Sequence, residues 1–300
     1  MKKELGFIGL GRMGLNMTTL LIEKGYRVIT VSRSEKSDAA ASKVGVEVVA
    51  DYAALKESLA PERLVWLMVP GEAVEGVMEE LLPHLDPGDT VVDGGNSFYQ
   101  KSLARHKSLE EKELNFLDCG TSGGMEGARH GASIMVGGQP EVFDRHEHVF
   151  AALAAENAYA RVGNPGAGHF VKMIHNGIEY GMMGAIAEGV TVLHEHEEEF
   201  GIDLKEVLKP YEHESIITSK LVSWLREAYD EGQIDMITGE VPTGETEFEM
   251  EHIIAELGDV KVLEAALAQR KGTREKASYL GKLVAAMRNQ FGGHKVIKPE

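Results

Sequence analysis

Four polar side chains fall on one narrow stripe of a predicted helix, and their types are those of an acid–base site. Lys172, His175, Asn176 and Glu179 lie at positions i, i+3, i+4 and i+7 within residues 166–187, so they share one face of a helix. Two turns separate Lys172 from Glu179, about 10 Å along the axis. This spacing suits an acid and a base that act at different atoms of one substrate.

The rest of this segment is mostly apolar or glycine, which is the reverse of an ordinary surface helix. We therefore expect a buried helix whose polar stripe faces an internal cleft, because a buried Lys or Glu is costly unless it is paired or useful. Gly177, Gly181 and Gly184 recur on another side and predict close packing of a neighbouring element. A structural ion pair of Lys172 and Glu179 inside a helical bundle is the alternative interpretation.

A glycine-rich turn near the N-terminus predicts a dinucleotide site. Its sequence, GLGRMG, fits G-x-G-x-x-G, follows a predicted strand and opens a predicted helix over Met13–Glu23, which is the context that this motif requires. The glycines permit a tight turn, a close approach to a pyrophosphate and helix–strand packing, and the helix N-terminus offers N–H groups to the phosphates. A tight turn without a ligand is the alternative. The expected contacts are Gly9, Leu10, Gly11, Arg12, Met13 and Gly14.

The end of the next predicted strand, Tyr26–Val31, bears on which nicotinamide cofactor binds. NAD sites usually place Asp or Glu there, whereas this chain has Ser32, Arg33 and Ser34. An arginine flanked by hydroxyls suits a 2′-phosphate, so we favour NADP over NAD. In the alternative interpretation, Arg33 is a solvated loop residue that stacks near the adenine.

These groups need two kinds of scaffold. In the first half, strand-like runs alternate with helical stretches, which predicts an α/β domain with a mostly parallel, doubly wound sheet, a Rossmann domain, at residues 1–164. The turn Gly163-Asn164-Pro165-Gly166 is the natural boundary, and an all-α C-terminal domain should follow at residues 165–300. The predicted strands are Leu5–Ile8, Tyr26–Val31, Arg63–Val69, Thr90–Asp93, Asn115–Cys119, Ser133–Val136 and Ala158–Val162. The later helices are predicted at His169–Glu199, Asp203–Tyr211, Ile216–Asp230, Glu247–Glu256, Val260–Gln269 and Arg274–Phe291.

The composition disfavours several classes of protein. Hydrophobic residues make up 43% of the chain and charged residues 26%, which is the balance of a globular protein. The net charge of −17 disfavours nucleic-acid binding, because phosphate backbones need a basic face. No apolar run approaches the roughly 20 residues that cross a bilayer, and the single cysteine, Cys119, suits a reducing cytoplasm. His194 and His196 lie on different sides of a helix, so we expect no metal site.

The chain resembles the decarboxylating 6-phosphogluconate dehydrogenases, in their short form with a smaller helical domain. The resemblance covers nearly the whole chain. Besides the cofactor motif it rests on four blocks, which are DGGNS at 93–97, GTSGGMEGA at 120–128, GHFVKMIHNGIEY at 168–180 and RNQFGGH at 288–294. It implies oxidative decarboxylation of 6-phospho-D-gluconate to D-ribulose 5-phosphate and CO2, a step of the pentose phosphate pathway and of gluconate utilisation.

The resemblance also implies roles for matching residues. Lys172 would be the general base and Glu179 the general acid. Arg270 matches an arginine that binds the substrate phosphate. Arg288 and His294 match a pair supplied by a neighbouring subunit, which implies a homo-oligomer, a dimer or a tetramer, with a shared active site. The sugar acid would be contacted by Asn96, Ser122, Gly123, Gly124, His175, Asn176 and Tyr180. The cofactor would also be contacted by Val69 and Asn96.

The sequence departs from the family after its Thr-Gly turn at residues 243–244. The family usually has a Trp there next to a Lys or Arg that helps to hold the phosphate, whereas this chain has Glu247 and Phe248. A carboxylate would repel phosphate, so a related 3-hydroxy-acid dehydrogenase acting on another sugar acid is the alternative enzyme. Glu179 argues against it, since simple oxidation needs no second acid. A non-catalytic NADP sensor is the third interpretation, and it would have no use for both Lys172 and Glu179.

Overall fold

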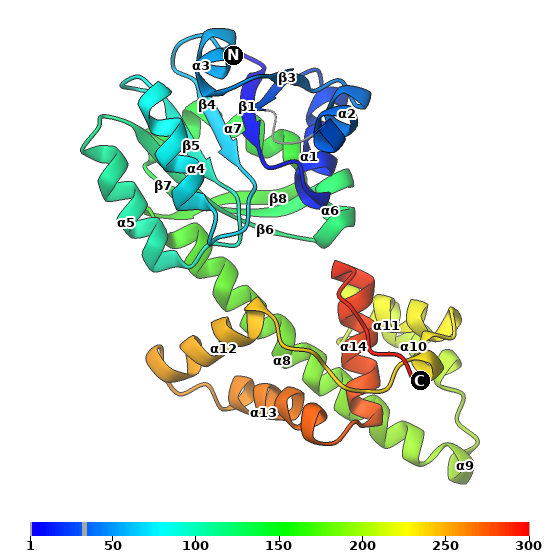
Figure 1. The fold of residues 1–300 in the computed structure, drawn as a ribbon. Coiled ribbons are helices and arrows are strands. Elements are labelled where there is room, and N and C mark those ends of the chain that lie inside the picture. Colours follow the sequence, from blue (N-terminus) through cyan, green and yellow to red (C-terminus); the bar gives the residue numbers. More distant parts are fainter. Residues whose placement is uncertain (1, 32–34, 300) are drawn as a thin grey trace. The chain divides into compact units, whose positions relative to one another are not determined.

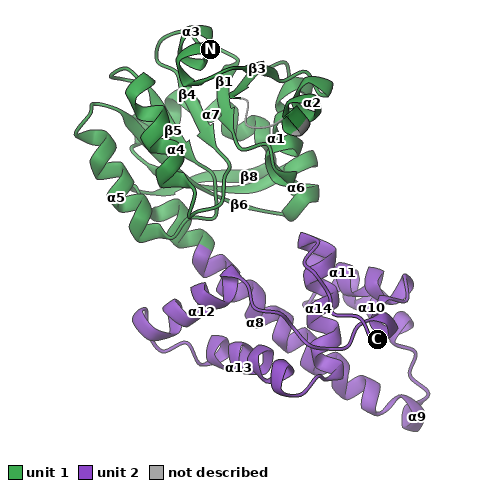
Figure 2. Cartoon of the chain, in the orientation of Figure 1, with its two compact units in different colours: residues 1–172 green, residues 173–300 purple. Residues whose placement is uncertain are grey.

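The computed structural model describes residues 2–31 and 35–299, and the chain divides into two compact units, Met1–Lys172 and Met173–Glu300 (Figure 2). The first unit holds the sheet and the helices that cover it, and the second is helical (Figure 1). Helix α8, Ala167–Glu195, begins in the first unit and continues into the second. The predicted fold class, a Rossmann α/β domain followed by an all-α region, is confirmed.

Eight strands form one sheet in the order β3-β2-β1-β4-β5-β6-β7-β8. The paired strands run parallel except β6 and β7, which are antiparallel. The short edge strand β3 was not predicted, because three residues are too few to establish a period. The bounds are β1 Glu4–Ile8, β2 Arg27–Val31, β3 Glu47–Val49, β4 Leu64–Leu67, β5 Thr90–Asp93, β6 Asn115–Ser122, β7 Ala132–Gly138 and β8 Ala154–Gly163.

Both faces of the sheet are covered, so its central strands are apolar on both sides. Phe7 and Trp66 stack on one face, where they join a core that includes residues of α1 and α7. Ile8 and Val65 point to the other face and pack with residues of α3, α4 and α5. The helices of this unit are α1 Arg12–Glu23, α2 Glu35–Lys43, α3 Tyr52–Ser58, α4 Val74–Leu81, η1 Leu82–His84, α5 Tyr99–Glu110, α6 Gly124–His130 and α7 Pro140–Leu153.

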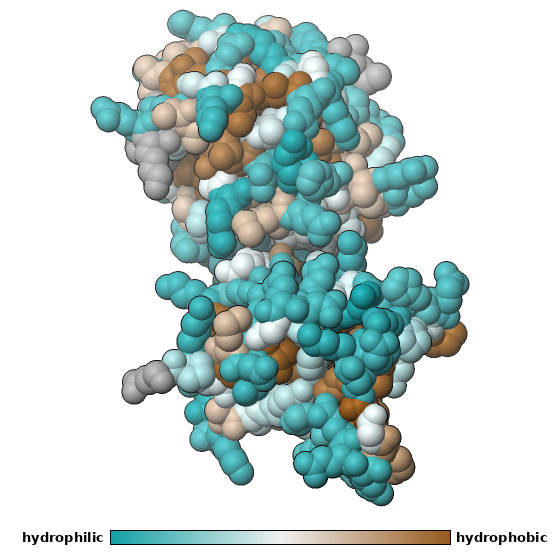
Figure 3. Space-filling view, turned by 90° about the vertical axis from the view of Figure 1, so that its right-hand side faces the viewer, coloured by the Kyte–Doolittle hydropathy of each residue, from teal (hydrophilic) through white to brown (hydrophobic). Residues whose placement is uncertain are grey.

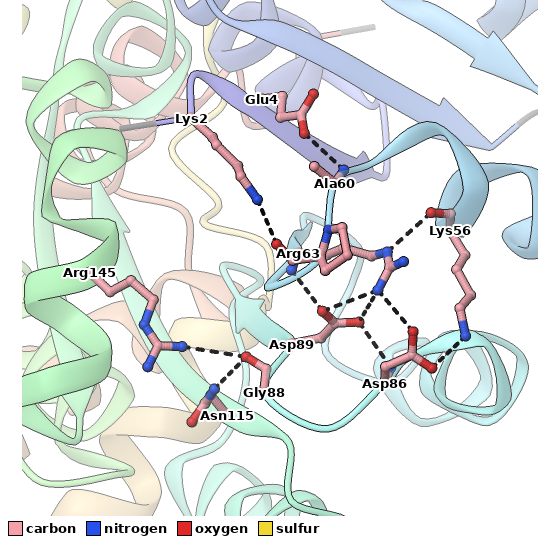
Figure 4. Close-up of polar contacts among 11 residues, drawn as sticks. Lys2, Glu4, Lys56, Ala60, Arg63, Asp86, Gly88, Asp89, Asn115 and Arg145 are labelled. Carbon is pink, nitrogen blue, oxygen red and sulfur yellow. Dashed lines mark hydrogen bonds and ion pairs between the residues drawn. The ribbon is translucent and has the colours of Figure 1, made fainter.

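An ion-pair network ties together the N-terminal ends of the central strands (Figure 4). Buried Arg63, before β4, donates to buried Asp89, before β5, over 3.1 Å, and Asp89 also accepts the backbone N–H of Arg63 over 2.7 Å. Asp86 accepts from Arg63 at 3.1 Å and from Lys56 at 2.5 Å. Ligands of open α/β sheets bind at the opposite, carboxyl ends of the strands. This network therefore has a structural role.

The second unit is built from helices around the core shared by α8, α10, α11 and α14. A predicted helix end at Gln269 is wrong, because α13 continues to Glu275. Gly272 weakens the helix by only about 1 kcal/mol, and α14 instead begins after Ser278, whose side chain accepts the backbone N–H of Gly281. The bounds are α9 Glu197–Phe200, α10 Leu204–Glu212, α11 Lys220–Asp230, η2 Gln233–Met236, α12 Glu245–Glu256, α13 Lys261–Glu275 and α14 Tyr279–Gly292.

Helix α8 confirms one expectation and contradicts another. A Cβ added at Gly177 would lie 2.8 Å from a methyl of Leu263, and a Cβ added at Gly184 would lie 3.4 Å from the Cβ of Ala266. The glycine face of α8 therefore allows α13 to pack closely, as expected. Burial outside the polar stripe is incomplete, however, because Ile178 is 54% exposed and Met182 is 43% exposed. These two lie one turn apart on a side that the unit leaves uncovered.

The face shown in Figure 3 is mostly hydrophilic, and its apolar residues form small patches. Within residues 2–31 and 35–299, no helix combines the length and the apolar character needed to cross a bilayer.

Candidate active site

The glycine-rich turn joins β1 to α1 at the carboxyl end of the sheet. Gly9 has φ +103°, and a side chain there would overlap the backbone of Met68. A side chain at Gly14 would overlap the carbonyl of Gly9, so α1 sits directly on the turn. At Gly11, by contrast, an added Cβ would meet no described atom within 4 Å. This backbone is open to a ligand, and its shape fits a dinucleotide pyrophosphate.

The first turn of α1 supports the same interpretation. Among the described residues, no side chain caps its N-terminus, which leaves its N–H groups for an anion. Arg12 is exposed in this turn, whereas Leu10 and Met13 pack partly against the core. The three residues that favoured NADP, Ser32, Arg33 and Ser34, lie outside the described residues, so that preference stays a prediction.

Two more expected cofactor residues, Val69 and Asn96, come from adjacent loops after β4 and β5. The glycine before Asn96 leaves no room for a side chain against the carbonyl of Val69, so the two loops lie in contact. Buried Arg105 fastens the second loop through Asp93 at 2.5 Å and Ser97 at 2.8 Å. Sequence reasoning missed Arg105, although a buried Asp93 at the end of a strand signals the need for a cation.

The turn from β6 into α6 carries Ser122, Gly123 and Gly124. β6 ends at Ser122, Gly123 has φ +115°, and α6 begins at Gly124. The left-handed backbone at Gly123 strongly favours glycine, and it leaves α6 without a side-chain cap among the described residues. The three predicted sugar-acid residues therefore form one turn that leads directly into α6.

Lys172 lies beside the same strand. A Cβ at Gly120 would be 2.5 Å from the Cβ of Lys172 and 2.9 Å from the carbonyl oxygen of Gly168. Any larger residue at this position would displace the start of α8, so the glycine determines how closely Lys172 approaches β6. The structure thus brings Lys172 to the strand that ends at Ser122, two residues further along.

The start of α8 is held by Asp118, which sequence reasoning missed. This buried side chain accepts the backbone N–H groups of Gly166 at 2.7 Å and His169 at 2.8 Å. A carboxylate at a helix N-terminus is stabilised by the helix dipole. His169 is also held at its side chain, since its Nδ1 lies 2.7 Å from the hydroxyl of Ser102. The signal in the sequence was an Asp inside the apolar run of β6.

Further along α8, the polar stripe continues in the second unit. His175 Nδ1 lies 3.7 Å from an oxygen of Glu179, one turn later. Asn176 is buried and donates to Glu249 of α12 over 2.7 Å. These contacts keep His175, Asn176 and Glu179 on one side of the helix, as their spacing predicted.

Three predicted substrate residues from three helices meet in the second unit. Arg288 of α14 donates its Nε–H to the hydroxyl of Tyr180 at 3.0 Å. The guanidinium of Arg270 lies over the ring of Tyr180, 4.9 Å from its centroid. Both arginines are buried and donate to the carbonyl of Pro242, at 2.9 and 3.1 Å. We call Arg270, Arg288 and their neighbour Arg274 the arginine cluster.

Arg288 has partners within its own chain, because its guanidinium bonds to Tyr180 and Pro242. Its role in the site of a neighbouring subunit, which the resemblance implied, stays a prediction. A single chain therefore suffices to place Arg288 beside Arg270. His294, the other residue of the expected pair, is exposed after α14, and its ring contacts Phe291 edge-on.

Glu247, the departure from the family pattern, is not an isolated carboxylate. It is 5% exposed and accepts from Arg274 at 2.8 and 3.0 Å, and it lies 3.4 Å from Nε of Arg270. Burial alone would raise the pKa of Glu247, but the hydrogen bond from Arg274 and the charge of Arg270 hold that pKa below its ordinary value. Burial lowers the pKa of Arg270 in turn. Phe248 points outward and is exposed.

Comparison with known families agrees with this geometry. Residues 4–163 match the family model of the NAD binding domain of 6-phosphogluconate dehydrogenase, and residues 168–198 match that of the 6-phosphogluconate dehydrogenase C-terminal domain. Fold and site define an NAD(P)-dependent oxidoreductase of the 6-phosphogluconate and 3-hydroxyacid dehydrogenase superfamily. Within it, the chain belongs to the 6-phosphogluconate dehydrogenase family, and the resemblance inferred from the sequence is confirmed.

Relatives of similar length span almost the entire chain. A Bacillus subtilis protein provisionally named a 6-phosphogluconate dehydrogenase is 37% identical over 98% of this chain and 99% of its own length. An NAD(+)-dependent, decarboxylating 6-phosphogluconate dehydrogenase of Haloferax volcanii is 36% identical over 99% of both chains. Among solved structures, the Plasmodium falciparum 6-phosphogluconate dehydrogenase has a TM-score of 0.80 at 29% identity. That match covers 91% of this chain and 64% of the Plasmodium chain.

Proposed function

We propose that the protein catalyses the oxidative decarboxylation of 6-phospho-D-gluconate to D-ribulose 5-phosphate and CO2. The observation that carries the proposal is the pair of buried guanidinium groups, Arg270 and Arg288, that both contact Tyr180. A phosphate matches guanidinium groups in charge and geometry. A sugar acid without phosphate would leave the buried Nη1 of Arg270, which has no hydrogen-bond partner among the described residues, unpaired, which is costly. Tyr180 follows Glu179 directly on α8, the helix that also carries Lys172.

In the mechanism that we propose, Lys172 is neutral when the substrate binds and takes the proton of the C3 hydroxyl. The turn Gly9–Gly14 would hold the nicotinamide cofactor, which would supply the acceptor for the hydride from C3. The 3-keto acid then loses C1 as CO2, and the electron pair of the C1–C2 bond passes into an enediol while protonated Lys172 donates to the C3 oxygen. Glu179 finally protonates C2, which becomes C1 of ribulose 5-phosphate.

The test is to measure cofactor reduction and CO2 release by the purified protein with 6-phosphogluconate. We expect both in equal amounts. Reduction without CO2 would favour a simple 3-hydroxy-acid dehydrogenase, and no reduction with any sugar acid would favour an NADP sensor. Replacing Lys172 by Met should abolish hydride transfer and spare cofactor binding. Replacing Glu179 by Gln should slow product formation after hydride transfer, and an unaffected rate would remove Glu179 from the acid role.

We further propose NADP as the preferred cofactor, on the strength of Arg33 between two serines. The relatives are named with both cofactors, since the Haloferax enzyme is called NAD(+)-dependent and the Plasmodium enzyme was solved with NADP+. Measuring kcat/KM with NADP and NAD side by side gives the preference directly. If Arg33 binds the 2′-phosphate, Arg33→Asp should reverse the preference for NADP over NAD. An unchanged ratio of the two kcat/KM values would mean that Arg33 does not bind the cofactor.

We also propose that the active form is a homo-oligomer in which His294 reaches a neighbouring active site. The support is the family pattern at the end of the chain, RNQFGGH, and the exposure of His294. Sedimentation analysis of the purified protein tests the assembly. Mixing an inactive Lys172→Met protein with an inactive His294→Ala protein should then restore part of the activity, and no restoration would mean that each chain completes its own site.

A further inference from the structure

The acidic residue that breaks the family pattern is bound to the arginine cluster on both of its oxygens. Arg274 follows Arg270 by one turn of α13, so both guanidinium groups face the same side and reach the same carboxylate. Glu247 takes two hydrogen bonds from Arg274 and lies against the Nε edge of Arg270. It therefore occupies that edge of Arg270 and leaves the rest of the guanidinium to other partners.

Arg270 keeps hydrogen-bonding capacity on its other edge. Its side chain is 2% exposed and its Nη2 donates to Pro242. Neither Nε nor Nη1 has a hydrogen-bond partner among the described residues; Nε has the 3.4 Å ion pair with Glu247, whereas no ion pair is found at Nη1 among them. A buried donor without a partner costs about 1–3 kcal/mol, so this N–H group is suited to a ligand. Arg288 converges on the same place, because a Cβ at Gly244 would lie 3.3 Å from its Nη2 and 3.6 Å from that of Arg270.

We propose that Glu247 and Arg274 are positioning residues for an oxyanion subsite formed by Arg270 and Arg288, and that they set its preference for a phosphorylated substrate. The inference rests on the proposed function, in which the substrate is a phosphorylated sugar acid. Glu247 holds Arg270 by the Nε edge, so that Nη1 stays directed to the oxyanion. The basic residue that the family usually carries at the position of Glu247 is thereby replaced by a carboxylate and its cation, Arg274.

Charge explains why Glu247 and Arg274 must act together. The arginine cluster and Glu247 carry three positive charges and one negative charge among these four side chains, so an excess of positive charge remains for an anion. Without Arg274, the buried carboxylate would pair with Arg270 alone and cancel its charge. Without Glu247, Arg274 and Arg270 would repel each other across one helix turn, and Arg270 would lose the contact that orients it.

Equilibrium binding to Glu247→Gln separates positioning from repulsion. Titration calorimetry would use 6-phosphogluconate, gluconate and inorganic phosphate as probes. If Glu247 orients Arg270, the Kd for 6-phosphogluconate and for phosphate should rise about tenfold, because the ion pair that orients the buried guanidinium is lost, while the Kd for gluconate stays the same. If Glu247 merely repels phosphate, both phosphate-containing probes should bind more tightly, and that result would overturn the proposal.

A double-mutant cycle tests whether Arg274 acts through Glu247. Arg274→Gln alone should weaken phosphate binding by at least tenfold, because the unpaired carboxylate then competes for Arg270. In the Glu247→Gln background, the same substitution should have little further effect, and an additive loss would show instead that Arg274 contacts the phosphate itself. Glu251→Gln is the matched control, because Glu251 pairs with the neighbouring Lys271 of α13 at 2.5 Å in a half-exposed position. It should bind all three probes like the wild type.

The same measurements separate this inference from the proposed function. If the substitutions at Glu247 and Arg274 change phosphate binding but the protein does not turn over 6-phosphogluconate, the subsite is supported and the proposed reaction is wrong. If the protein turns over 6-phosphogluconate and neither substitution changes the rate, the reaction is supported and the positioning role of Glu247 and Arg274 is wrong. Thermal unfolding checks that each variant is folded. Should Arg274→Gln fail to fold, Arg274→Lys keeps the charge, and we expect it to bind phosphate about as tightly as the wild type does.

Discussion

Replacing Gly120 by alanine tests whether strand β6 holds Lys172 in the position that the proposed mechanism requires. The added Cβ would lie 2.5 Å from the Cβ of Lys172 and 2.9 Å from the carbonyl oxygen of Gly168. Carbon atoms in contact normally lie about 3.5–4 Å apart, so the start of α8 must move by roughly 1 Å. The obstacle cannot rotate away, because both atoms belong to or adjoin the backbone of α8.

Two effects of different size follow from this displacement. Overpacking of a well-packed contact costs about 1–3 kcal/mol, which lowers Tm by roughly 2–4 °C per kcal/mol in a domain of this size. A misplacement of about 1 Å at a catalytic group costs roughly 100-fold in rate. We therefore expect Gly120→Ala to lower kcat by about two orders of magnitude in a protein that is still folded at the assay temperature and still binds its cofactor.

The assay combines thermal unfolding, cofactor titration and steady-state turnover of 6-phosphogluconate. Gly189→Ala is the control, because it also lies in α8 but an added Cβ there meets no described atom within 4 Å. It should leave kcat unchanged and raise stability by about 0.5–1 kcal/mol, since alanine favours a helix interior. Wild-type kcat and Tm in Gly120→Ala would refute the reasoning, and loss of cofactor binding would place the damage elsewhere in the first unit.

Three further predictions concern stability. Burial lowers the pKa of His146 to about 4 from 6.5. Its stabilising contribution as a neutral group is therefore complete above pH 6.5 and falls by up to about 3 kcal/mol as the pH drops toward 4. The free energy of unfolding of His146→Gln, measured with denaturant, should change less with pH in that window than that of the wild type. The same change in both proteins would contradict the prediction. Asp89→Ala should cost about 3 kcal/mol, because it removes the buried carboxylate that pairs with buried Arg63. Asp86→Ala should cost clearly less, because its carboxylate is half-exposed; similar losses would count against the network. Ser278→Ala should cost about 1 kcal/mol as a lost N-cap of α14, visible as a lower midpoint in urea, and an unchanged midpoint would show that the cap is dispensable.

Local patterns predicted those features that depend on neighbours in the chain. The period of α8 indicated both its polar stripe and its glycine face, because residues three and four apart share a helix side. The turn before α1 was predicted from its motif and its position between strand and helix. The end of α13 was misplaced, because a single Gly272 is a weak signal and the packing of Leu267 and Thr273 decides whether the helix continues.

The charged partners of the site could not be predicted in this way. Asp118 precedes Gly166, whose N–H it accepts at the start of α8, by 48 residues, and Glu247 precedes Arg274 by 27. Whether such groups meet depends on which helix faces pack together, and no local period carries that information. The sequence predicted that Glu247 would repel phosphate, because the sequence does not show that Arg270 and Arg274 contact its carboxylate.

By itself, then, the sequence determined the class of fold, the dinucleotide turn and the family, because each is encoded in short motifs and in the periods of single elements. It also placed Lys172 and Glu179 on one helix face. Only the tertiary structure decided that Gly120 holds Lys172 against β6, that Arg288 joins Arg270 within one chain, and that Glu247 is neutralised by Arg274. These are contacts between elements distant in sequence, and close packing rather than local propensity selects them.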